Sequence, residues 1–292
     1  MHEPVLLEEV LDGLQIKPGG RYVDGTLGRG GHAEAIAKRL KDGRLLGLEV
    51  DPENLKSAEA RLQPFGDLIL TRRVNFRGLP SVLRDVGWES VDGMLFDLGT
   101  SVEQLSGPSF SFTGDIPLDM RLDPSQSETA ATYLAKVDER DLADLLFRYG
   151  EPRGSRRLAR TLLSEVAAGR LNTNADLARL CERVLGRFGP RHPATRTFLA
   201  LRSAVNDENG ATEEMMRQAP SLLAVGGRIA VITFHSLEDR LVKHGFKAIA
   251  MEGVDGKTFS LPFKKPVEPG DDERTRNPRS RSAKLRILER VS

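Results

Sequence analysis

Three groups of residues in this sequence could do chemistry, and each follows a short apolar run. The segment DGTLGRGGH begins at Asp24, contains four glycines and ends at His32. Asp97 follows the run MLF, and His235 follows GGRIAVITF in the string FHSLED. Glycines let backbone amides approach a ligand, carboxylates accept its hydrogen bonds, and histidine exchanges protons near neutral pH. These patterns indicate a ligand site at the ends of strands.

The glycine-rich segment is typical of a loop that binds a nucleotide-type cofactor. Gly30 and Gly31 precede a helical pattern, and a helix N-terminus adds the positive end of its dipole. Glu49 stands about 20 residues after the loop, where a carboxylate accepts hydrogen bonds from ribose hydroxyls, with Asp51 as the fallback. No GKS or GKT follows the glycines, which excludes a P-loop. NAD and S-adenosylmethionine both satisfy this pattern.

Residues after the next two apolar runs favour the methyl donor, S-adenosylmethionine. Phe76 in RVNFRGL can lie against an adenine ring, with packing in the core as an equal alternative. Asp97 is expected at a strand's carboxyl end, where ligands of open α/β sheets bind. A carboxylate in such a position needs a polar partner or a ligand, because burying an unpaired charge is unfavourable. We expect Asp97 and Ser101 to supply polar groups at the reaction centre.

The string FHSLED gives a second candidate for catalysis. His235 at a strand end is expected to contact substrate or act as a base, whereas Ser236 with Asp239 fits a helix capping box. A metal site from His235, Glu238 and Asp239 is disfavoured, because no second histidine is suitably spaced. We therefore expect no metal.

The elements that must position these residues follow an α/β rhythm. Short apolar runs at 21–27, 44–50, 67–73 and 91–99 alternate with helical patterns, and the rhythm returns at 226–234. This spacing predicts βαβ units, a parallel sheet and a Rossmann-like methyltransferase fold. The runs at 257–269 and 281–290, joined by a polar loop at 271–280, are expected to pair antiparallel on the sheet edge.

The stretch between Asp97 and the fifth strand predicts an inserted, mainly helical domain. We place it at 105–205, with 1–104 and 206–292 forming the methyltransferase domain. Residues 148–202 hold 12 arginines against four acidic residues. Guanidinium groups bind phosphate and stack on bases, so a phosphate-rich partner is plausible. Phe110 and Phe112 could stack on a base that has left its helix, although two alternate aromatics also fit one face of a core.

Nearly the whole chain resembles the bacterial family of small-subunit ribosomal RNA cytosine-N4 methyltransferases, known as RsmH or MraW. The strings that carry the resemblance occur in family order: EPVLLEEVLDGL, DGTLGRGGH, DLGTSVEQL, FSFTGDIPLDMRLDP, YGEPR, HPATRTFLALR, FHSLEDRLVK and NPRSRSAKLR. The resemblance implies methylation of a cytidine N4 in the decoding region of 16S ribosomal RNA, with an assembled small subunit as partner.

The resemblance also assigns residues to roles. It implies cofactor contacts by Gly30, Gly31, His32, Glu49, Phe76, Asp97 and Gln104, and RNA contacts by Asp115, Arg196, Arg202 and Asn206. Two positions depart from the family pattern. Glu49 stands where the family usually has Asp, and Val102 stands where it usually has a second serine.

Three other functions remain as alternatives at this stage. A non-catalytic ribosomal RNA-binding or assembly factor is motivated by Val102 and Glu49, and an NAD-dependent oxidoreductase by the glycine loop. A small-molecule methyltransferase is disfavoured by the arginine-rich insertion. One cysteine and the lack of a leader or long apolar run fit the cytoplasm and no membrane, and a homodimer is left open.

Overall fold

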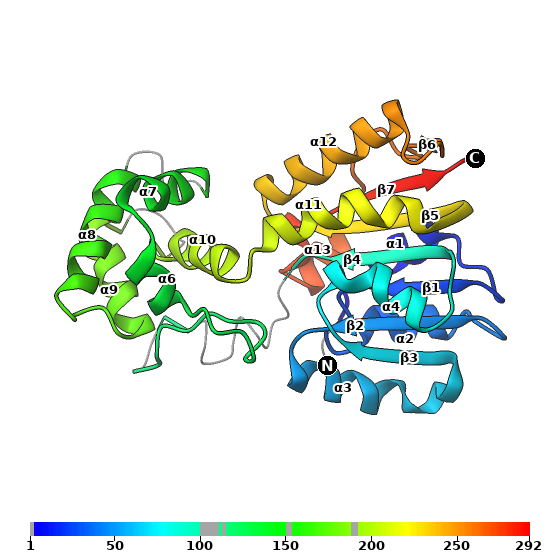
Figure 1. Ribbon diagram of the computed structural model, residues 1–292, viewed down its shortest axis with the longest axis horizontal. Helices are drawn as coiled ribbons and strands as arrows, with labels where there is room; N and C mark the ends of the chain where they lie inside the picture. The colour runs from blue at the N-terminus through cyan, green and yellow to red at the C-terminus, as the bar shows by residue number, and fades with distance from the viewer. Residues whose placement is uncertain (1–2, 100–110, 113–114, 150–153, 188–191) are drawn as a thin grey trace. The chain divides into compact units, whose positions relative to one another are not determined.

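The computed structural model describes residues 3–99, 111–112, 115–149, 154–187 and 192–292 of the chain (Figure 1). The chain divides into two compact units: unit 1 comprises Met1–Gly99 and Asn209–Ser292, and unit 2 comprises Thr100–Glu208. Within the described ranges, no helix combines the length and apolar character needed to cross a membrane.

Unit 1 is built on a seven-stranded sheet in the order β3-β2-β1-β4-β5-β7-β6. Strands β1 to β5 run parallel, and β7 runs antiparallel to both β5 and β6. The strands are β1 (Arg21–Asp24), β2 (Arg44–Glu49), β3 (Ile69–Arg73), β4 (Val91–Asp97), β5 (Leu223–Thr233), β6 (Phe259–Ser260) and β7 (Lys284–Arg290).

Helices cover both faces of this sheet and bury its side chains. One face packs against α4 (Leu79–Asp85), α11 (Glu208–Gln218) and α12 (Ser236–Glu252). The other packs against α1 (Leu7–Leu14), α2 (Gly31–Ala37) and α3 (Pro52–Leu62). Because side chains alternate along a strand, both faces of a strand such as β4 must be apolar: Met94 and Phe96 face one helical layer and Leu95 the other. The remaining elements of unit 1 are η1 (Gln63–Leu68), η2 (Phe76–Gly78), η4 (Ala219–Leu222), α13 (Asp271–Arg276) and η5 (Ser280–Ser282).

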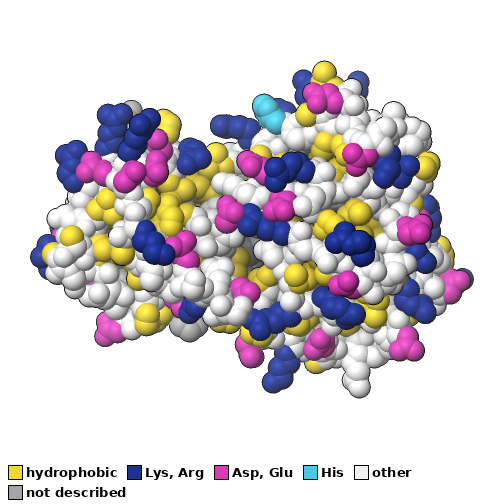
Figure 2. Space-filling model, viewed as in Figure 1, with side chains coloured by type: hydrophobic (Ala, Val, Ile, Leu, Met, Phe, Trp, Pro, Cys, Tyr) yellow, Lys and Arg dark blue, Asp and Glu magenta, His cyan; other side chains and the backbone are white. Residues whose placement is uncertain are grey.

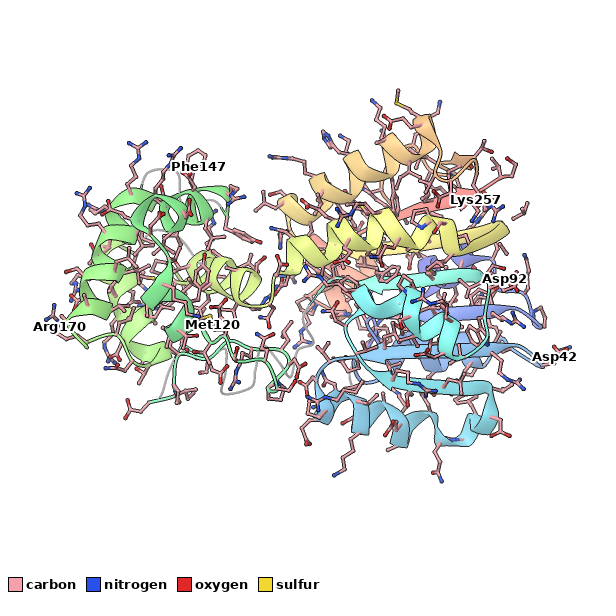
Figure 3. The ribbon with its side chains drawn as sticks, in the orientation of Figure 1. Asp42, Asp92, Met120, Phe147, Arg170 and Lys257 are labelled. Atoms are coloured by element: carbon pink, nitrogen blue, oxygen red, sulfur yellow. The ribbon has the colours of Figure 1, made fainter. Side chains whose placement is uncertain are left out.

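The strand order reverses between β1 and β4. These two strands lie side by side, although 66 residues lie between the end of β1 and the start of β4. Val23 pairs with Met94 and Asp24 with Leu95. Ligands of open α/β sheets bind at the carboxyl ends of the strands, where the order reverses. The amino ends carry structural contacts instead: Asp92 at the start of β4 accepts from Lys17 Nζ at 2.9 Å (Figure 3).

Unit 2 contains five described helices with side-chain caps at three of them. Thr129 and Thr173 form capping boxes with Thr132 and Asp176, and Asp138 accepts from the amide of Asp141. The chain's single cysteine, Cys181, is fully buried. The helices are α6 (Ala130–Lys136), α7 (Glu139–Arg148), α8 (Ser155–Ala167), α9 (Asn174–Leu185) and α10 (Thr195–Val205).

Most elements expected from the sequence are present. The parallel strands and the antiparallel edge pair are confirmed, although β6 is only two residues long. The prediction of a loop over 271–280 is wrong, because Asp271–Arg276 forms α13 and Ser280–Ser282 forms η5. Acidic residues in the first turn of α13 and arginines in its last turn complement the helix dipole, and this stabilises a short polar helix.

Gly25, between β1 and the glycine loop, gives a test of this packing. A Cβ there would lie 2.4 Å from Cε1 of Phe96, inside the core between β1 and β4. We expect Gly25→Ala to lower the free energy of unfolding by about 1–3 kcal/mol, measured by urea titration. Gly270→Ala is the matched control, because nothing lies within 4 Å of its Cβ position, and it should change stability little. Equal stability of the two variants would contradict the close approach.

Candidate active site

Four carboxylates stand at the carboxyl edge of the sheet. Asp24 ends β1, Glu49 ends β2, Asp97 ends β4, and Glu238 lies in the first turn of α12, directly after β5. Asp24 is 1% exposed, Glu238 6% and Glu49 9%. The fold therefore concentrates negative charge where the strand order reverses.

Burial raises the pKa of three of these carboxyl groups, those of Asp24, Glu49 and Asp97. It raises the pKa of Asp24 to about 7, against the hydrogen bonds from Thr26, and the charge of Glu49 adds to the rise. Burial also raises the pKa of Asp97 to about 7, and the charges of Asp24 and Glu238 add to it. Among the described residues, no lysine or arginine forms an ion pair with these four groups. Such a cluster favours a cationic ligand, because buried carboxylates need a positive partner.

Glu49 holds the glycine loop against the end of β2. Its Oε2 accepts from the amide of Gly28 at 2.8 Å, and its Oε1 accepts from the amides of Val50 and Asp51. Gly28 has φ +51°, which the loop requires and which glycine adopts without strain. Asp51, the fallback, caps α3 by accepting from Glu53 and Asn54. A ribose contact by Glu49 stays a prediction.

Gly30 and Gly31 lie where α2 begins, pressed against neighbouring segments. Gly30 has φ +78°, and a Cβ at that position would lie 3.4 Å from the Cα of Ala58 in α3. A Cβ at Gly31 would lie 2.7 Å from Cγ of Pro4. The close approach explains why this strand-to-helix turn is glycine-rich.

His32 connects the loop to Asp97. It is 7% exposed, its Nε2 lies 2.9 Å from the carbonyl oxygen of Val5, and its Nδ1 lies 3.9 Å from Oδ2 of Asp97. A carbonyl only accepts, so Nε2 carries a proton and, in the neutral ring, Nδ1 is the acceptor. His32 therefore lies beside Asp97 at ion-pair distance, too far for a direct hydrogen bond.

Thr26 is a site residue that the sequence analysis missed. Its Oγ1 accepts from the amide of Asp97 at 2.6 Å, and its own amide donates to Oδ1 of Asp24 at 3.1 Å. A side-chain hydrogen bond from Thr26 also lowers the pKa of Asp24. One hydroxyl group thus joins the ends of β1 and β4. The only signal in the sequence was a threonine two residues after Asp24, a spacing typical of a turn.

Phe76 lies in η2, just beyond β3. Its ring meets that of Phe96 edge to face, with centroids 5.5 Å apart, and it packs on the core beneath the sheet edge. The ring is only partly buried, so the structure gives Phe76 a packing role and leaves part of it accessible. Contact with adenine stays a prediction.

His235 caps α12, and the predicted capping box from Ser236 and Asp239 is wrong. His235 Nδ1 accepts from the amide of Glu238, while Glu238 Oε2 accepts from the amides of Phe234 and His235. Glu238 Oε1 lies 2.9 Å from His235 Nε2. Asp239 instead pairs with Arg286 at 2.7 Å on β7. The box is shifted by one residue because β5 ends at Thr233. A role of His235 as a base stays a prediction.

Some predicted site residues lie outside the described residues or in unit 2. Ser101 and Gln104 lie outside the described residues, as does Phe110. The ring of Phe112 lies 4.7 Å from the rings of His192 and Phe198. Phe112 therefore packs inside unit 2.

The four predicted RNA contacts differ in their surroundings. Arg202 is 5% exposed and donates to both carboxylate oxygens of Glu208, at 2.6 and 2.8 Å. Asn206 Oδ1 accepts from the amide of Leu122 at 2.7 Å and its Nδ2 donates to the carbonyl of Met120. These two side chains hold unit 2 together, whereas Arg196 and Asp115 are exposed. RNA contact by any of them stays a prediction.

Six of the ten described arginines of 148–202 form ion pairs with carboxylates of unit 2. Arg170 and Arg183 share Glu165, at 2.6 and 2.8 Å (Figure 3 labels Arg170). Over 100–208 the chain has 15 basic and 15 acidic residues, so the positive charge of the arginine-rich segment is offset inside the same unit. Further pairs are Arg160–Glu139, Arg179–Asp176 and Arg187–Glu182.

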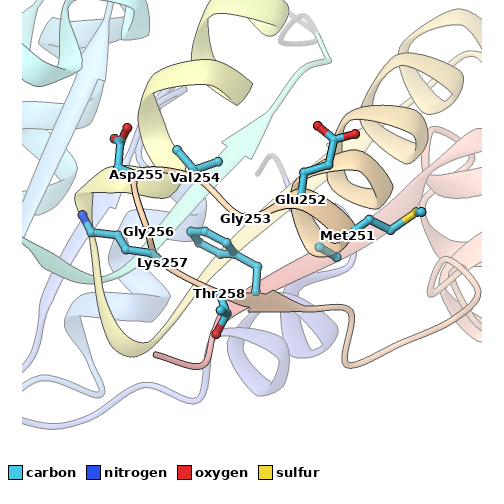
Figure 4. Close-up of a pocket in the computed structure, with 10 residues that line it drawn as sticks. Met251, Glu252, Gly253, Val254, Asp255, Gly256, Lys257 and Thr258 are labelled. Carbon is cyan, nitrogen blue, oxygen red and sulfur yellow. The ribbon is translucent and has the colours of Figure 1, made fainter.

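A cavity of about 280 Å³ lies at the opposite end of α12 from this edge, lined by Ala250–Phe259 (Figure 4). Lys257, on its rim, donates to the carbonyl oxygen of Ser221. Its lining includes none of the candidate residues at the carboxyl edge. Among the described residues, no three His, Cys, Asp or Glu side chains are grouped as metal ligands.

A Rossmann-like sheet with an antiparallel β7 and an acidic carboxyl edge defines the class: unit 1 has the fold of S-adenosylmethionine-dependent methyltransferases. Residues 1–291 match the MraW methylase family, and the chain belongs to that family.

Relatives share this similarity along most of their length. A "Ribosomal RNA small subunit methyltransferase H" from Solibacter usitatus is 43% identical over 99% of both chains. Proteins of the same name from Dehalococcoides mccartyi and Cyanothece sp. are 43% and 42% identical, covering 99% and 100% of this chain and 86% and 95% of theirs. The family match does not support the NAD-dependent alternative.

Thr26 can be tested with two substitutions. We expect Thr26→Val to leave the buried amide of Asp97 without an acceptor, costing about 1–3 kcal/mol of stability and reducing methyl transfer, whereas Thr26→Ser restores both. Urea titration and single-turnover methyl transfer measure these effects. A serine variant as impaired as the valine variant would show that the hydroxyl is not what matters.

The raised pKa values predict a pH dependence of cofactor binding. A cationic ligand binds the ionised carboxylates, and Asp24 and Asp97 each have a pKa of about 7. Affinity for S-adenosylmethionine should therefore weaken as pH falls below 7, by up to about tenfold per pH unit for each proton released on binding, and level off above pH 8. Calorimetry in buffers of different ionisation enthalpy counts those protons. Binding without proton release at pH 6 would contradict the assignment.

Proposed function

We propose that this chain transfers a methyl group from S-adenosylmethionine to N4 of a cytidine in the decoding region of 16S ribosomal RNA. The observation that carries the proposal is the acidic edge formed by the buried carboxylates of Asp24, Glu49 and Glu238 and the partly exposed carboxylate of Asp97. Membership of the MraW methylase family and relatives named as small subunit methyltransferases support the choice of RNA. The cytidine and its position come from the family resemblance of the sequence.

The residues at this edge fit S-adenosylmethionine. Three of the carboxylates are buried and Asp97 is partly exposed, and none has a lysine or arginine partner among the described residues, so a ligand with a sulfonium and an ammonium group would compensate their charge. The glycine loop leads into the N-terminus of α2, and Phe76 offers part of an aromatic face. When bound, the cofactor supplies an electrophilic methyl group.

The residues of this chain must mainly align and deprotonate the acceptor amine. Holding the amine at near-attack distance accounts for much of the acceleration in such a transfer. Asp97 can accept a hydrogen bond from the N4–H group, which restores nucleophilic character to its delocalised lone pair. After transfer, the proton passes from N4 to Oδ2 of Asp97, whose pKa of about 7 suits a proton acceptor at neutral pH.

Three finer features belong to the same proposal. Unit 2 is the substrate-recognition domain, with the boundaries predicted from the sequence at 105 and 205. The substrate is an assembled small ribosomal subunit rather than naked RNA. The enzyme acts in the cytoplasm, where these ribosomal subunits are found. A target base must leave its stack, or already be unpaired, to reach Asp97.

One experiment tests the reaction itself. Labelled methyl transfer to small subunits that lack the modification, followed by nucleoside mass spectrometry, should yield one N4-methylcytidine per subunit. Asp97→Asn keeps the size of the side chain and removes its charge, so we expect a rate reduced by about 10²–10⁴. Ser101→Ala tests the other polar group predicted at the reaction centre. Near-normal rates in both variants would exclude them from the chemistry, and methylation of a different nucleotide would refute the proposed substrate.

A further inference from the structure

One face of α12 carries cations and no carboxylate. Arg240, Lys243, His244 and Lys247 are all exposed and follow the spacing i, i+3, i+4, i+7, which places them on a single helical face. We call these four residues the α12 stripe. The first turn holds Glu238, which is buried, and Asp239, which pairs with Arg286 on β7. Neither of these two carboxylates forms an ion pair with a residue of the stripe.

The stripe differs from the arginines of unit 2 in having no partners. In the part of the chain that the structure describes, none of its four side chains makes a hydrogen bond or an ion pair, whereas Arg170 and Arg183 share a carboxylate. Figure 2 shows dark blue side chains and a cyan histidine over the part of unit 1 where α12 lies. Four uncompensated groups therefore face solvent along one side of a helix.

The helix that carries the stripe is firmly fixed in unit 1. Its opposite face buries Val242, Phe246 and Ile249 in the core. Its first turn is held by the His235–Glu238 cap and by the Asp239–Arg286 pair, which is largely buried. Arg240 lies five residues after His235, roughly 8 Å along the helix axis, so the stripe starts close to the carboxyl edge of the sheet.

We propose that the α12 stripe binds the phosphate backbone of the RNA substrate; this inference rests on the proposed function. A straight row of like charges complements a linear polyanion, and lysine binds phosphate as a point charge. A protein partner would need apolar or aromatic residues at the centre of the interface, and the stripe has none there. Met251 lies at the far end of the same face.

The test compares two triple variants. Arg240→Gln, Lys243→Gln and Lys247→Gln together remove three charges from the stripe, and glutamine preserves helix propensity. The control, Lys56→Gln, Lys264→Gln and Lys265→Gln, removes three charges at other exposed positions that likewise have no partner. Both proteins are assayed for S-adenosylmethionine affinity, for methyl transfer, and for binding to small subunits and to a synthetic decoding-region RNA.

We expect the stripe variant to bind RNA about tenfold more weakly at roughly 0.1 M salt. The slope of its plot of log affinity against log salt concentration should be smaller in magnitude by about two, because each lost phosphate contact reduces that slope by about 0.7. KM for RNA should rise with kcat unchanged. The control variant should match the wild type in all these quantities, and S-adenosylmethionine affinity should stay constant in both.

The outcomes separate this inference from the proposed function. If wild-type protein methylates small subunits but the stripe variant keeps its RNA affinity and salt slope, the stripe does not bind RNA. Weaker binding to subunits with unchanged binding to naked RNA would assign the stripe to a ribosomal protein, which also overturns the inference. If the wild type transfers no methyl group while the stripe variant loses RNA affinity, the stripe stands and the proposed reaction fails.

Discussion

The interaction on which the rest of this structure depends is the repulsion among buried carboxylates at the ends of β1 and β4. Asp24 and Asp97 are brought together by the reversal of strand order, and water cannot screen them fully. The unfavourable electrostatic free energy of this arrangement must be compensated by other interactions. Thr26 and backbone amides compensate part of it, and a cationic ligand would compensate the rest.

The sequence was sufficient for the fold because its apolar runs and glycines act locally. The runs ending at Asp24, Glu49 and Asp97 are long enough and apolar enough to fix the parallel strands, and the carboxyl edge follows from their direction. The role of Thr26 could not be predicted, because its hydroxyl accepts a hydrogen bond from Asp97, 71 positions away in the sequence. The two residues meet only because β1 and β4 are neighbours in the sheet. Such contacts depend on strand pairing, which no local pattern specifies.

The charged residues were harder to interpret than the apolar ones. The arginine-rich composition suggested phosphate binding. In the structure, however, Arg202 is buried and forms an ion pair with Glu208, and Arg170 and Arg183 both pair with Glu165. Pairing depends on which helices pack together, and a count of charges does not report it. The cations of α12 stood out only once each side chain's partners were known.

Cys181 has a consequence for studying the two units separately. It is the only cysteine of the chain and is fully buried in α9, within unit 2. A thiol reagent can reach it only when that unit opens, so the labelling rate reports the local opening equilibrium of unit 2 in the native protein. The chain thus contains its own probe of whether its helical insertion unfolds with the sheet or independently of it.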